Sequence, residues 1–600
     1  DIFSGHHYRP SQPQASAISL ERGMDNECAD FGEPSGDSDY EPFLTAVQQG
    51  YLPETAIDQA LIRLFTARIR LGMFDPPSQV RYARIPASEL DSPAHRQLAL
   101  RLGEESMVLL KNDGVLPLRS VKRIAVIGPL ADQTAVLLGN YNGYPTHTVS
   151  LLEGMKAAFP KAAITYVPGT QFLSNQGTPV PTSALTTPDG KPGLKAEYRA
   201  GVGMATAATP LASRVESTVD LDESDLPAGV PSDSAFTVEW TGYIDPPKSG
   251  GYLLGVKADG FAQVSVGDEQ VVRMYIEASN MSPVHLEKGH PIKIDVVYGR
   301  RGDKPQAQLI WAPVDDTPDP AAVAAARNAD VVVAAVGITS RLEGEEMPVH
   351  YPGFLGGDRT DLEMPEPEEA LLREVAATGK PLVVVLMNGS ALAATWEKEH
   401  ANAILEAWYS GEEGGAAIAD TLSGKNDPSG RLPVTFYKDV NQLPNFEDYS
   451  MKGRTYRYFT GQPLWPFGYG LSYTTFRYAD LTLPKTAIAA GAPLDLSVRV
   501  TNTGKLAGDE VAQLYLQFPD VPGAPVRALR AFQRTHLAAG ESRMIRFHLT
   551  RRDLSMVTQA GDRIVADGSY TVSVGGGQPG TDAPSVSGTV QVHGRIQLPE

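Results

Sequence analysis

Short runs of apolar, mostly β-branched residues return at intervals along the chain. They occupy residues 123–132 (RIAVIGPLAD), 329–337 (ADVVVAAVG) and 380–389 (KPLVVVLMNG). Runs of this kind are typical of parallel strands that are buried on both faces of a sheet. Between the last two lies EEALLREVAATG, whose apolar residues recur at helical spacing before a glycine. Strands alternating with helices predict an α/β/α sandwich over residues 101–169 and 317–440.

Two other regions have the pattern of all-β domains. Residues 170–316 alternate apolar and polar positions between turn signals and show no helical period. We therefore expect an inserted β-sandwich that divides the α/β domain in two. Residues 478–600 also alternate with period two, as in PLDLSVRVTNTGK, and predict a C-terminal β-sandwich after a connector at 441–477.

The segment 1–75 has the pattern of the end of a domain. Ile57, Leu61 and Phe65 recur at helical spacing in a predicted helix that begins near Pro53 and stops at Gly72. The residues before this helix are mostly loop-like, so the core on which its apolar face packs is expected to lie upstream of Asp1. Residues 76–100, rich in proline and serine, are expected to form a linker.

Composition narrows the function classes. The chain has 600 residues, enough for several domains, and a formal charge of −19, which disfavours nucleic acid and anionic membranes as partners. It contains no apolar run long enough to span a membrane. Cys28 is the only cysteine, His and Cys lack zinc-binding spacing, and the GPLAD turn at 128–132 lacks a G-x-G-x-x-G pattern. We therefore expect no metal, no cofactor and a neutral substrate.

The candidate chemistry lies in residues 341–359, RLEGEEMPVHYPGFLGGDR. Glu343, Glu345 and Glu346 follow a predicted buried strand directly, and ligand groups in open α/β sheets gather at the carboxyl ends of strands. A solvated acidic loop is the alternative interpretation. Arg359 favours a site, because its guanidinium can pair with a carboxylate and order the loop.

Several segments in order resemble glycoside hydrolase family 3. The glutamate loop is similar to the family's acid/base loop, which reads roughly E-x-E-G and then D-R. Further matching segments are RLGMFDPP (70–77), EAWYSGEEGG (406–415), SGRLPVTF (429–436) and PLWPFGYGLSYTTF (463–476). GLKAEYRAG at 193–201 resembles the protective-antigen-like β-sandwich of some members, and the C-terminal region resembles their fibronectin type III-like domain. The resemblance implies that residues 1–75 are the end of a (β/α)₈ barrel.

The resemblance also implies a mechanism with two carboxyl groups, which in a retaining glycosidase lie about 5 to 5.5 Å apart. Glu345 matches the family's acid/base best, with Glu343 and Glu346 as alternatives. The family's nucleophilic aspartate stands just before the segment that corresponds to DIFSGHHY, so it is expected upstream of this chain. His6, His7 and Tyr8 are then candidates for the sugar pocket, although an ordinary loop pair of histidines is equally compatible with the sequence. Arg359 is a further candidate for substrate binding.

The function implied is that of a retaining, exo-acting β-glycosidase that releases terminal β-D-glucose or β-D-xylose from the non-reducing end of plant-type oligosaccharides. A non-catalytic carbohydrate-binding or assembly protein is the alternative. The resemblance further implies that residues 1–600 alone are inactive and that a separate N-terminal barrel piece completes the site. A homodimer and a periplasmic or secreted location are compatible with these expectations.

Overall fold

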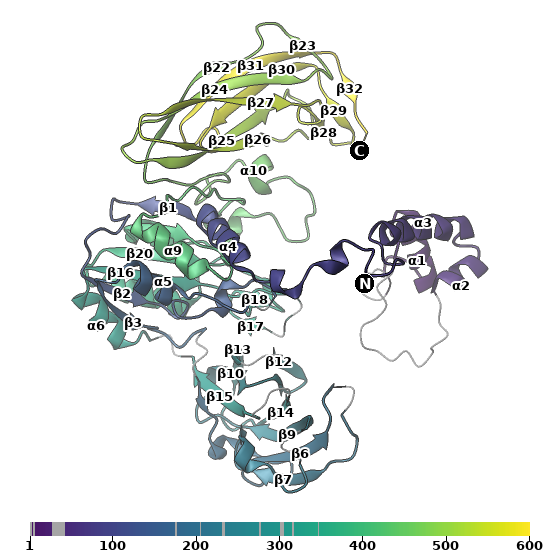
Figure 1. Cartoon of the computed structure of the whole chain (residues 1–600), viewed down its shortest axis with the longest axis vertical. Helices are drawn as coiled ribbons and strands as arrows, with labels where there is room; N and C mark the ends of the chain where they lie inside the picture. The colour runs from purple at the N-terminus through teal and green to yellow at the C-terminus, as the bar shows by residue number, and fades with distance from the viewer. Residues whose placement is uncertain are drawn as a thin grey trace. The chain divides into compact units, whose positions relative to one another are not determined.

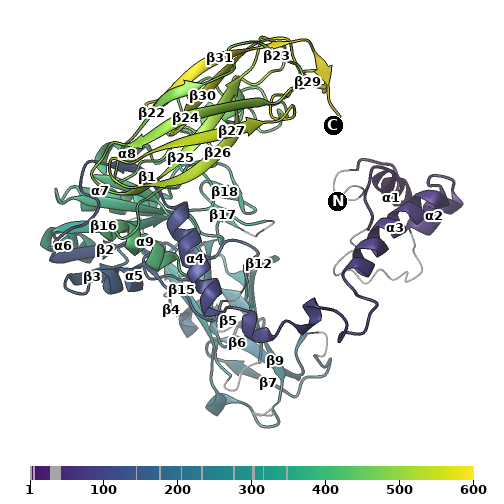
Figure 2. The same cartoon turned by 45° about the horizontal axis from the view of Figure 1, so that its top comes forward.

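A computed structural model describes most of the chain. The described residues are 3, 7–26, 42–143, 145–173, 177–203, 206–230, 234–274, 278–300, 305–314, 317–345, 347 and 349–599. Cys28, His6 and Glu346 lie outside them. The chain divides into two compact units, residues 1–92 and 93–600, and each is described by itself (Figures 1 and 2).

The first unit is helical. It contains α1 (Gln12–Glu21), α2 (Pro42–Gln48) and α3 (Glu54–Arg70), followed by short 3₁₀ turns at Tyr82–Arg84 and Ala87–Glu89. The helix predicted between Pro53 and Gly72 is confirmed, because α3 starts after Pro53 and the chain leaves it at Gly72 with a φ of 72°. A small apolar cluster of Ala17, Leu20, Ala46, Leu52 and Ala60 joins the three helices.

The second unit is built around a six-stranded sheet with the strand order β1-β21-β20-β16-β2-β3. The strands are β1 (Val108–Asn112), β2 (Arg123–Ile127), β3 (Ala163–Val167), β16 (Val331–Gly337), β20 (Leu382–Met387) and β21 (Ala403–Glu406). All neighbours pair in parallel except β1 and β21, which are antiparallel. Every residue of β16 and β20 is buried, which explains their continuous apolar sequence.

Helices cover both faces of this sheet, as the alternating pattern predicts. α4 (Pro93–Ser106), α5 (Leu151–Ala158) and α9 (Gly414–Ser423) pack together, and α6 (Pro320–Asn328) packs with α7 (Glu366–Ala376) (Figures 1 and 2). The short helix α8 (Thr395–His400) connects β20 to β21. Because α4 begins at Pro93, the end of the segment 76–100, expected to be a linker, is helical. The chain adds β3 on one side of β2 and then β16, β20 and β21 in turn on the other side, so the strand order reverses between β2 and β16. In such folds ligands bind beyond the carboxyl ends of the strands at this point.

A β-sandwich is inserted between β3 and α6. One sheet has the order β13-β10-β15-β4, with β8 beside β15; the other has the order β12-β11-β14-β9-β6-β7, with β5 beside β9. The strands are β4 (Thr178–Pro179), β5 (Leu185–Thr186), β6 (Leu194–Ala200), β7 (Ala212–Glu216), β8 (Asp220–Leu221), β9 (Phe236–Ile244), β10 (Gly250–Ala258), β11 (Phe261–Val266), β12 (Glu269–Met274), β13 (Ala278–Leu286), β14 (Ile292–Gly299) and β15 (Ala307–Pro313). The two sheets enclose a separate apolar core that includes Trp240, Tyr198 and Tyr298.

A second β-sandwich ends the chain, after a connector that contains the short helix α10 (Thr455–Tyr458). Its sheets have the orders β22-β24-β27 and β23-β31-β30-β25-β26, with a small third sheet β28-β29-β32. The strands are β22 (Phe476–Thr482), β23 (Ile488–Ala489), β24 (Leu494–Asn502), β25 (Gly508–Gln517), β26 (Ala528–Leu537), β27 (Ser542–Leu549), β28 (Met556–Val557), β29 (Arg563–Val565), β30 (Gly568–Gly575), β31 (Ser585–His593) and β32 (Ile596–Gln597).

A buried ion pair joins this sandwich to the α/β domain. Arg431 donates from Nη2 to Glu510 Oε2 at 2.8 Å, and the two side chains are only 9% and 2% exposed. The Tyr478 hydroxyl donates to the other oxygen of Glu510 at 2.6 Å. Since breaking a buried ion pair leaves an unpaired charge, the contact between Arg431 and Glu510 holds the two domains together. No helix among the described residues is long and apolar enough to cross a membrane.

Candidate active site

The glutamate loop leaves the carboxyl end of β16 and folds back on itself. It forms a small antiparallel sheet of β17 (His350–Tyr351), β18 (Phe354–Leu355) and β19 (Asp358–Arg359). The Gly344 N–H donates to the Gly357 carbonyl oxygen at 3.2 Å and closes the loop. A Cβ atom on Gly357 would lie 2.0 Å from the Gly344 carbonyl oxygen, and its φ is 90°, so this position of the GGDR segment requires glycine.

Glu343 is half-buried and is held by donors from two other loops. It accepts hydrogen bonds from the Gly389 N–H at 2.8 Å, from the Tyr409 hydroxyl at 2.6 Å and from the Ser390 hydroxyl. Gly389 and Ser390 follow β20, and Tyr409 follows β21, so the carboxyl ends of three parallel strands meet at this carboxylate. Burial, and then the charge of Glu343, raise the pKa of Tyr409 far above its usual value, so its hydroxyl remains a donor at neutral pH.

Arg359 belongs to the same cluster. Its Nη1 donates to Ser390 Oγ at 3.1 Å and its Nε to the Asp361 carbonyl oxygen at 2.9 Å, while the guanidinium lies 5.3 Å from the centre of the Phe354 ring. Burial lowers the pKa of Arg359, and the negative charge of Glu343 opposes that shift. The Ser390 hydroxyl thus lies between the guanidinium and the carboxylate and links the two.

Glu345 lies in a more open position than Glu343. Its side chain is exposed, and its carboxylate accepts a hydrogen bond from the hydroxyl of Tyr141, which is 82% exposed. Tyr141 stands in the long connection between β2 and α5 with a φ of 56°, an uncommon conformation for a non-glycine residue. A carboxyl group with one exposed partner can move toward a bound ligand at little cost, whereas Glu343 would first have to leave three donors.

His7 and Tyr8 precede α1 in the first unit. Tyr8 is 60% exposed, and the Arg9 guanidinium lies 4.3 Å from the centre of its ring. His7 has a φ of 49°. They are described within that unit alone, and His6 lies outside the described residues.

Sequence reasoning missed the donors Gly389, Ser390 and Tyr409. A signal was present, because both LMNGS at 386–390 and EAWYS at 406–410 follow apolar strand runs, as the glutamate loop does. Loops at the carboxyl ends of neighbouring parallel strands converge, so polar residues at these points are expected to lie close together. Among the described residues, no group of three or more His, Cys, Asp or Glu side chains is placed to hold a metal ion.

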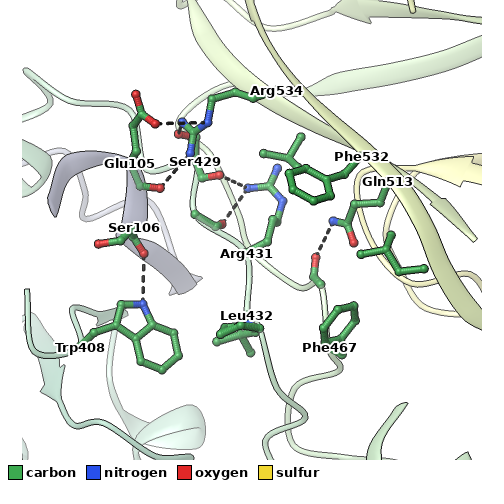
Figure 3. A pocket seen from close by; sticks show the side chains of 15 residues that line it. Glu105, Ser106, Trp408, Ser429, Arg431, Leu432, Phe467, Gln513, Phe532 and Arg534 are labelled. Carbon is green, nitrogen blue, oxygen red and sulfur yellow. Dashed lines mark hydrogen bonds and ion pairs between the residues drawn. The ribbon is translucent and has the colours of Figure 1, made fainter. Parts of the chain in front are cut away.

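The residue before Tyr409 points to a different place. Trp408 lines a cavity of about 410 Å³ between the α/β domain and the C-terminal sandwich, where its indole N–H donates to the Ser106 carbonyl oxygen at 3.1 Å (Figure 3). The polar groups of this cavity already have partners in its wall: Arg431 donates to the Ser429 and Gly430 carbonyl oxygens, and Gln513 to that of Gly468. Its free surface is therefore mainly apolar.

Comparison with known proteins gives this geometry a family context. The glycosyl hydrolase family 3 C-terminal domain matches residues 107–473, and the fibronectin type III-like domain matches residues 510–578. A xylan 1,4-beta-xylosidase of Xylanibacter ruminicola is 34% identical over 92% of this chain and 64% of its own length. A periplasmic beta-glucosidase of Salmonella typhimurium is 29% identical over 94% of this chain and 58% of its own length. The chain thus spans less than two thirds of these curated relatives.

Solved structures show the same fold. A beta-glucosidase from Streptomyces venezuelae, in complex with D-glucose, has a TM-score of 0.68 and 25% identity over 96% of this chain and 70% of its own. A beta-glucosidase from Kluyveromyces marxianus, in complex with glucose, has a TM-score of 0.65 and 23% identity over 97% of this chain and 72% of its own. Since the family domain alone covers more than half of its residues, this chain belongs to glycosyl hydrolase family 3.

Proposed function

We propose that the protein is a retaining, exo-acting β-glycosidase that releases terminal β-D-glucose or β-D-xylose from plant-type oligosaccharides. The observation that carries the proposal is the different surroundings of two glutamates in the same loop. Glu343 accepts hydrogen bonds from three donors, while Glu345 is exposed at the same sheet edge. The names of the relatives, beta-xylosidase and beta-glucosidase, support this substrate class.

In this proposal Glu345 is the acid/base residue. A general acid needs a proton on an oxygen that can reach the leaving group, and Glu345 has an exposed carboxyl group for this step. Glu343 instead receives hydrogen bonds from donors that already point at both of its oxygens, so a proton on it would compete with them. Its role is to fix the loop, together with Ser390 and Arg359.

The second carboxyl group of the mechanism is proposed to be an aspartate on a (β/α)₈ barrel strand, in the part of the relatives' length that this chain does not span. His6, His7 and Tyr8 are proposed to contribute to substrate binding, and so is Arg359. A periplasmic or secreted location and a homodimer also remain proposals; the periplasmic relative supports the former.

The leaving group provides the test of the Glu345 assignment. The variant Glu345→Gln should lower turnover of unactivated oligosaccharides by about 10²- to 10⁴-fold and turnover of activated aryl glycosides far less, because an activated leaving group needs little protonation. Glu343→Gln is the matched control: it keeps the side-chain volume but disturbs the loop, so it should lower both turnovers to a similar extent. Azide should rescue Glu345→Ala and yield a β-glycosyl azide, since the small anion replaces the base.

Equal losses on both substrates for Glu345→Gln, with a leaving-group dependence for Glu343→Gln, would move the acid role to Glu343. Normal turnover by both variants would exclude both glutamates as the acid/base, whereas no turnover by any form of the protein would favour a carbohydrate-binding protein. Assays should use residues 1–600 alone and together with a barrel segment. We expect turnover only in the second case, because the nucleophile is proposed to come from that segment.

A further inference from the structure

Glu406, at the carboxyl end of β21, contacts the two loops that supply the hydrogen-bond donors to Glu343. Its side chain is fully buried. Its Oε1 accepts a hydrogen bond from the Trp408 N–H at 3.2 Å, and its Oε2 accepts one from Asn388 Nδ2, also at 3.2 Å. One carboxyl group therefore contacts both loops that reach Glu343, the loop after β20 and the loop after β21.

Each of the two hydrogen bonds to Glu406 holds a turn whose residues donate hydrogen bonds to Glu343. Asn388 Nδ2 also donates to the Ser390 carbonyl oxygen at 2.9 Å, and this closes a tight turn that presents the Gly389 N–H and the Ser390 hydroxyl. On the other side, the Trp408 N–H is held to Glu406, and the next residue, Tyr409, turns its hydroxyl to Glu343.

The turn at Trp408 needs such support. Trp408 has a φ of 59°, an uncommon conformation for a bulky residue that neighbouring contacts must maintain. Its indole N–H donates to the Ser106 carbonyl oxygen, which holds the ring in the cavity beside the C-terminal sandwich (Figure 3). The hydrogen bond from its N–H to Glu406 fixes the backbone between this anchor and Tyr409.

The buried surroundings of Glu406 disfavour a charge on its carboxyl group. Burial raises the pKa of the Glu406 carboxyl well above its usual value, and the nearby charge of Glu343 raises it further against the hydrogen bonds from Asn388 and Trp408. Burial therefore favours the protonated form of this carboxyl group, and glutamine is the closest substitute for that form in shape and charge.

We propose that Glu406 is a positioning residue, which orders the three donors on Glu343 and thereby fixes the loop that carries Glu345. The inference rests on the proposed function for its catalytic meaning, but the contacts themselves can be tested without turnover. Two variants separate the effects. Glu406→Gln keeps an oxygen for the Trp408 N–H, while Glu406→Leu keeps the approximate volume and removes both acceptors.

Hydrogen exchange of the full 600-residue chain, read in peptides spanning 386–391 and 406–411, tests the contacts. Glu406→Leu should speed exchange at the Gly389 and Trp408 amides by about tenfold or more, because the Trp408 N–H loses its acceptor and the turn loosens. Glu406→Gln should keep exchange at the Trp408 amide within about threefold of wild type, because its oxygen still accepts from that N–H, whereas its amide nitrogen cannot accept from Asn388 Nδ2. Glu397→Leu is the matched control: it removes another buried glutamate of the same domain that bonds to none of these donors.

Unchanged exchange in Glu406→Leu, or the same increase in Glu397→Leu, would overturn the inference. If Glu406→Leu does not fold, Asn388→Ala decides, since it removes both hydrogen bonds of the Asn388 amide and leaves the one from the Trp408 N–H to Glu406: faster exchange at Gly389 with a protected Trp408 amide supports the arrangement, and unchanged exchange at Gly389 refutes it.

Turnover measured with the barrel segment present gives the catalytic readout. A positioning role predicts that Glu406→Leu lowers kcat on oligosaccharides by about tenfold to a hundredfold with little change in KM, and that Glu406→Gln restores most of it. A parallel loss of kcat in Glu397→Leu would show a general effect on stability instead. If no form of the protein turned over glycosides, the proposed function would fail, whereas the exchange result would still decide whether Glu406 orders the donors.

Discussion

At the scale of single residues, buried carboxyl groups make the stability of the α/β domain depend on pH. Glu397 on α8 is 1% exposed, and its Oε1 has no hydrogen-bond partner among the described residues. Burial raises the pKa of Glu397 to about 7, and the charges of Glu369 and Glu363 add to this shift while Arg373 opposes it. The protonated form is therefore the one that the fold accommodates.

This shift predicts a pH window. A carboxyl group whose pKa is higher in the folded than in the unfolded state stabilises the fold below the unfolded value of about 4.5 and loses that contribution as pH rises to about 7. Glu397→Gln mimics the protonated form, so it should exceed wild type by no more than about 1 kcal/mol at pH 5 and by about 3 kcal/mol at pH 8. Thermal melting at both pH values checks this. Glu374→Gln, at an exposed position, should show no such difference; a wild-type advantage at pH 8 would contradict the assignment.

The residue scale is also where sequence reasoning is weakest for the candidate site. Glu343 and Glu345 are two positions apart in one acidic loop, and only the family resemblance favours Glu345. The structure distinguishes them by their partners, and these come from 46 and 66 residues away for Gly389 and Tyr409 and from 204 residues away for Tyr141. Periodicity places a loop at a strand end, but it does not say which donors from other loops meet it.

At the scale of elements, close helix packing explains one of the glycine-rich segments. α5 and α9 cross where Gly154 meets Gly415: a Cβ on Gly154 would lie 2.2 Å from the Gly415 carbonyl oxygen, and one on Gly415 would lie 2.1 Å from that of Ser150. Gly415 of EAWYSGEEGG therefore lets the two helices approach, and the loop before α9 carries Tyr409 to Glu343.

The close crossing predicts a stability effect. Gly154→Ala would raise helix propensity, but its methyl group has to displace the backbone of α9, so we expect a net loss of about 1 to 3 kcal/mol. Lys156→Ala, at an exposed position of the same helix, is the control and should change stability by less than about 0.5 kcal/mol. Denaturant unfolding followed by tryptophan fluorescence measures both. A more stable Gly154→Ala would show that the helices separate more easily than their packing implies.

Strands with a continuous apolar sequence were predictable, whereas short strands that form only when a loop pairs with itself were not. The apolar runs correspond to β2, β16 and β20, because strands buried on both faces need apolar residues at every position. The two-residue strands β17 to β19 have no such run, since their pairing comes from the loop closing on itself. α4 extends into a segment expected to be a linker. Its residues Leu98, Leu100 and Leu102 recur at every second position, which is a weak helical signal and explains why the start of the helix was not predicted.

At the scale of the second unit, the inserted sandwich lies against the glutamate loop. β13 of the insert packs beside β17 of the loop. Phe172, in the segment between β3 and β4, stacks on Tyr351 of β17 with ring centres 4.8 Å apart. The two ends of the insert lie side by side, because Thr178 pairs with Trp311 and Pro179 pairs with Ile310. A domain attached in this way at the rim of a site can limit the space available to a substrate.

The predicted effect of the insert is on substrate length. Since Thr178 and Trp311 are paired neighbours, a short glycine-serine linker can replace residues 178–313 without moving the α/β domain, whose apolar core is separate from that of the insert. We expect this deletion to raise kcat/KM for tetrasaccharides relative to disaccharides by about tenfold, with little change in the melting of the α/β domain. Tyr351→Ala, which removes the stacking contact and retains the insert, is the matched control and should cause a smaller change in the same direction. An unaltered length profile after deletion would identify the insert as a spacer or a distant binding module, because a domain that borders the substrate cannot be removed without changing which substrates fit.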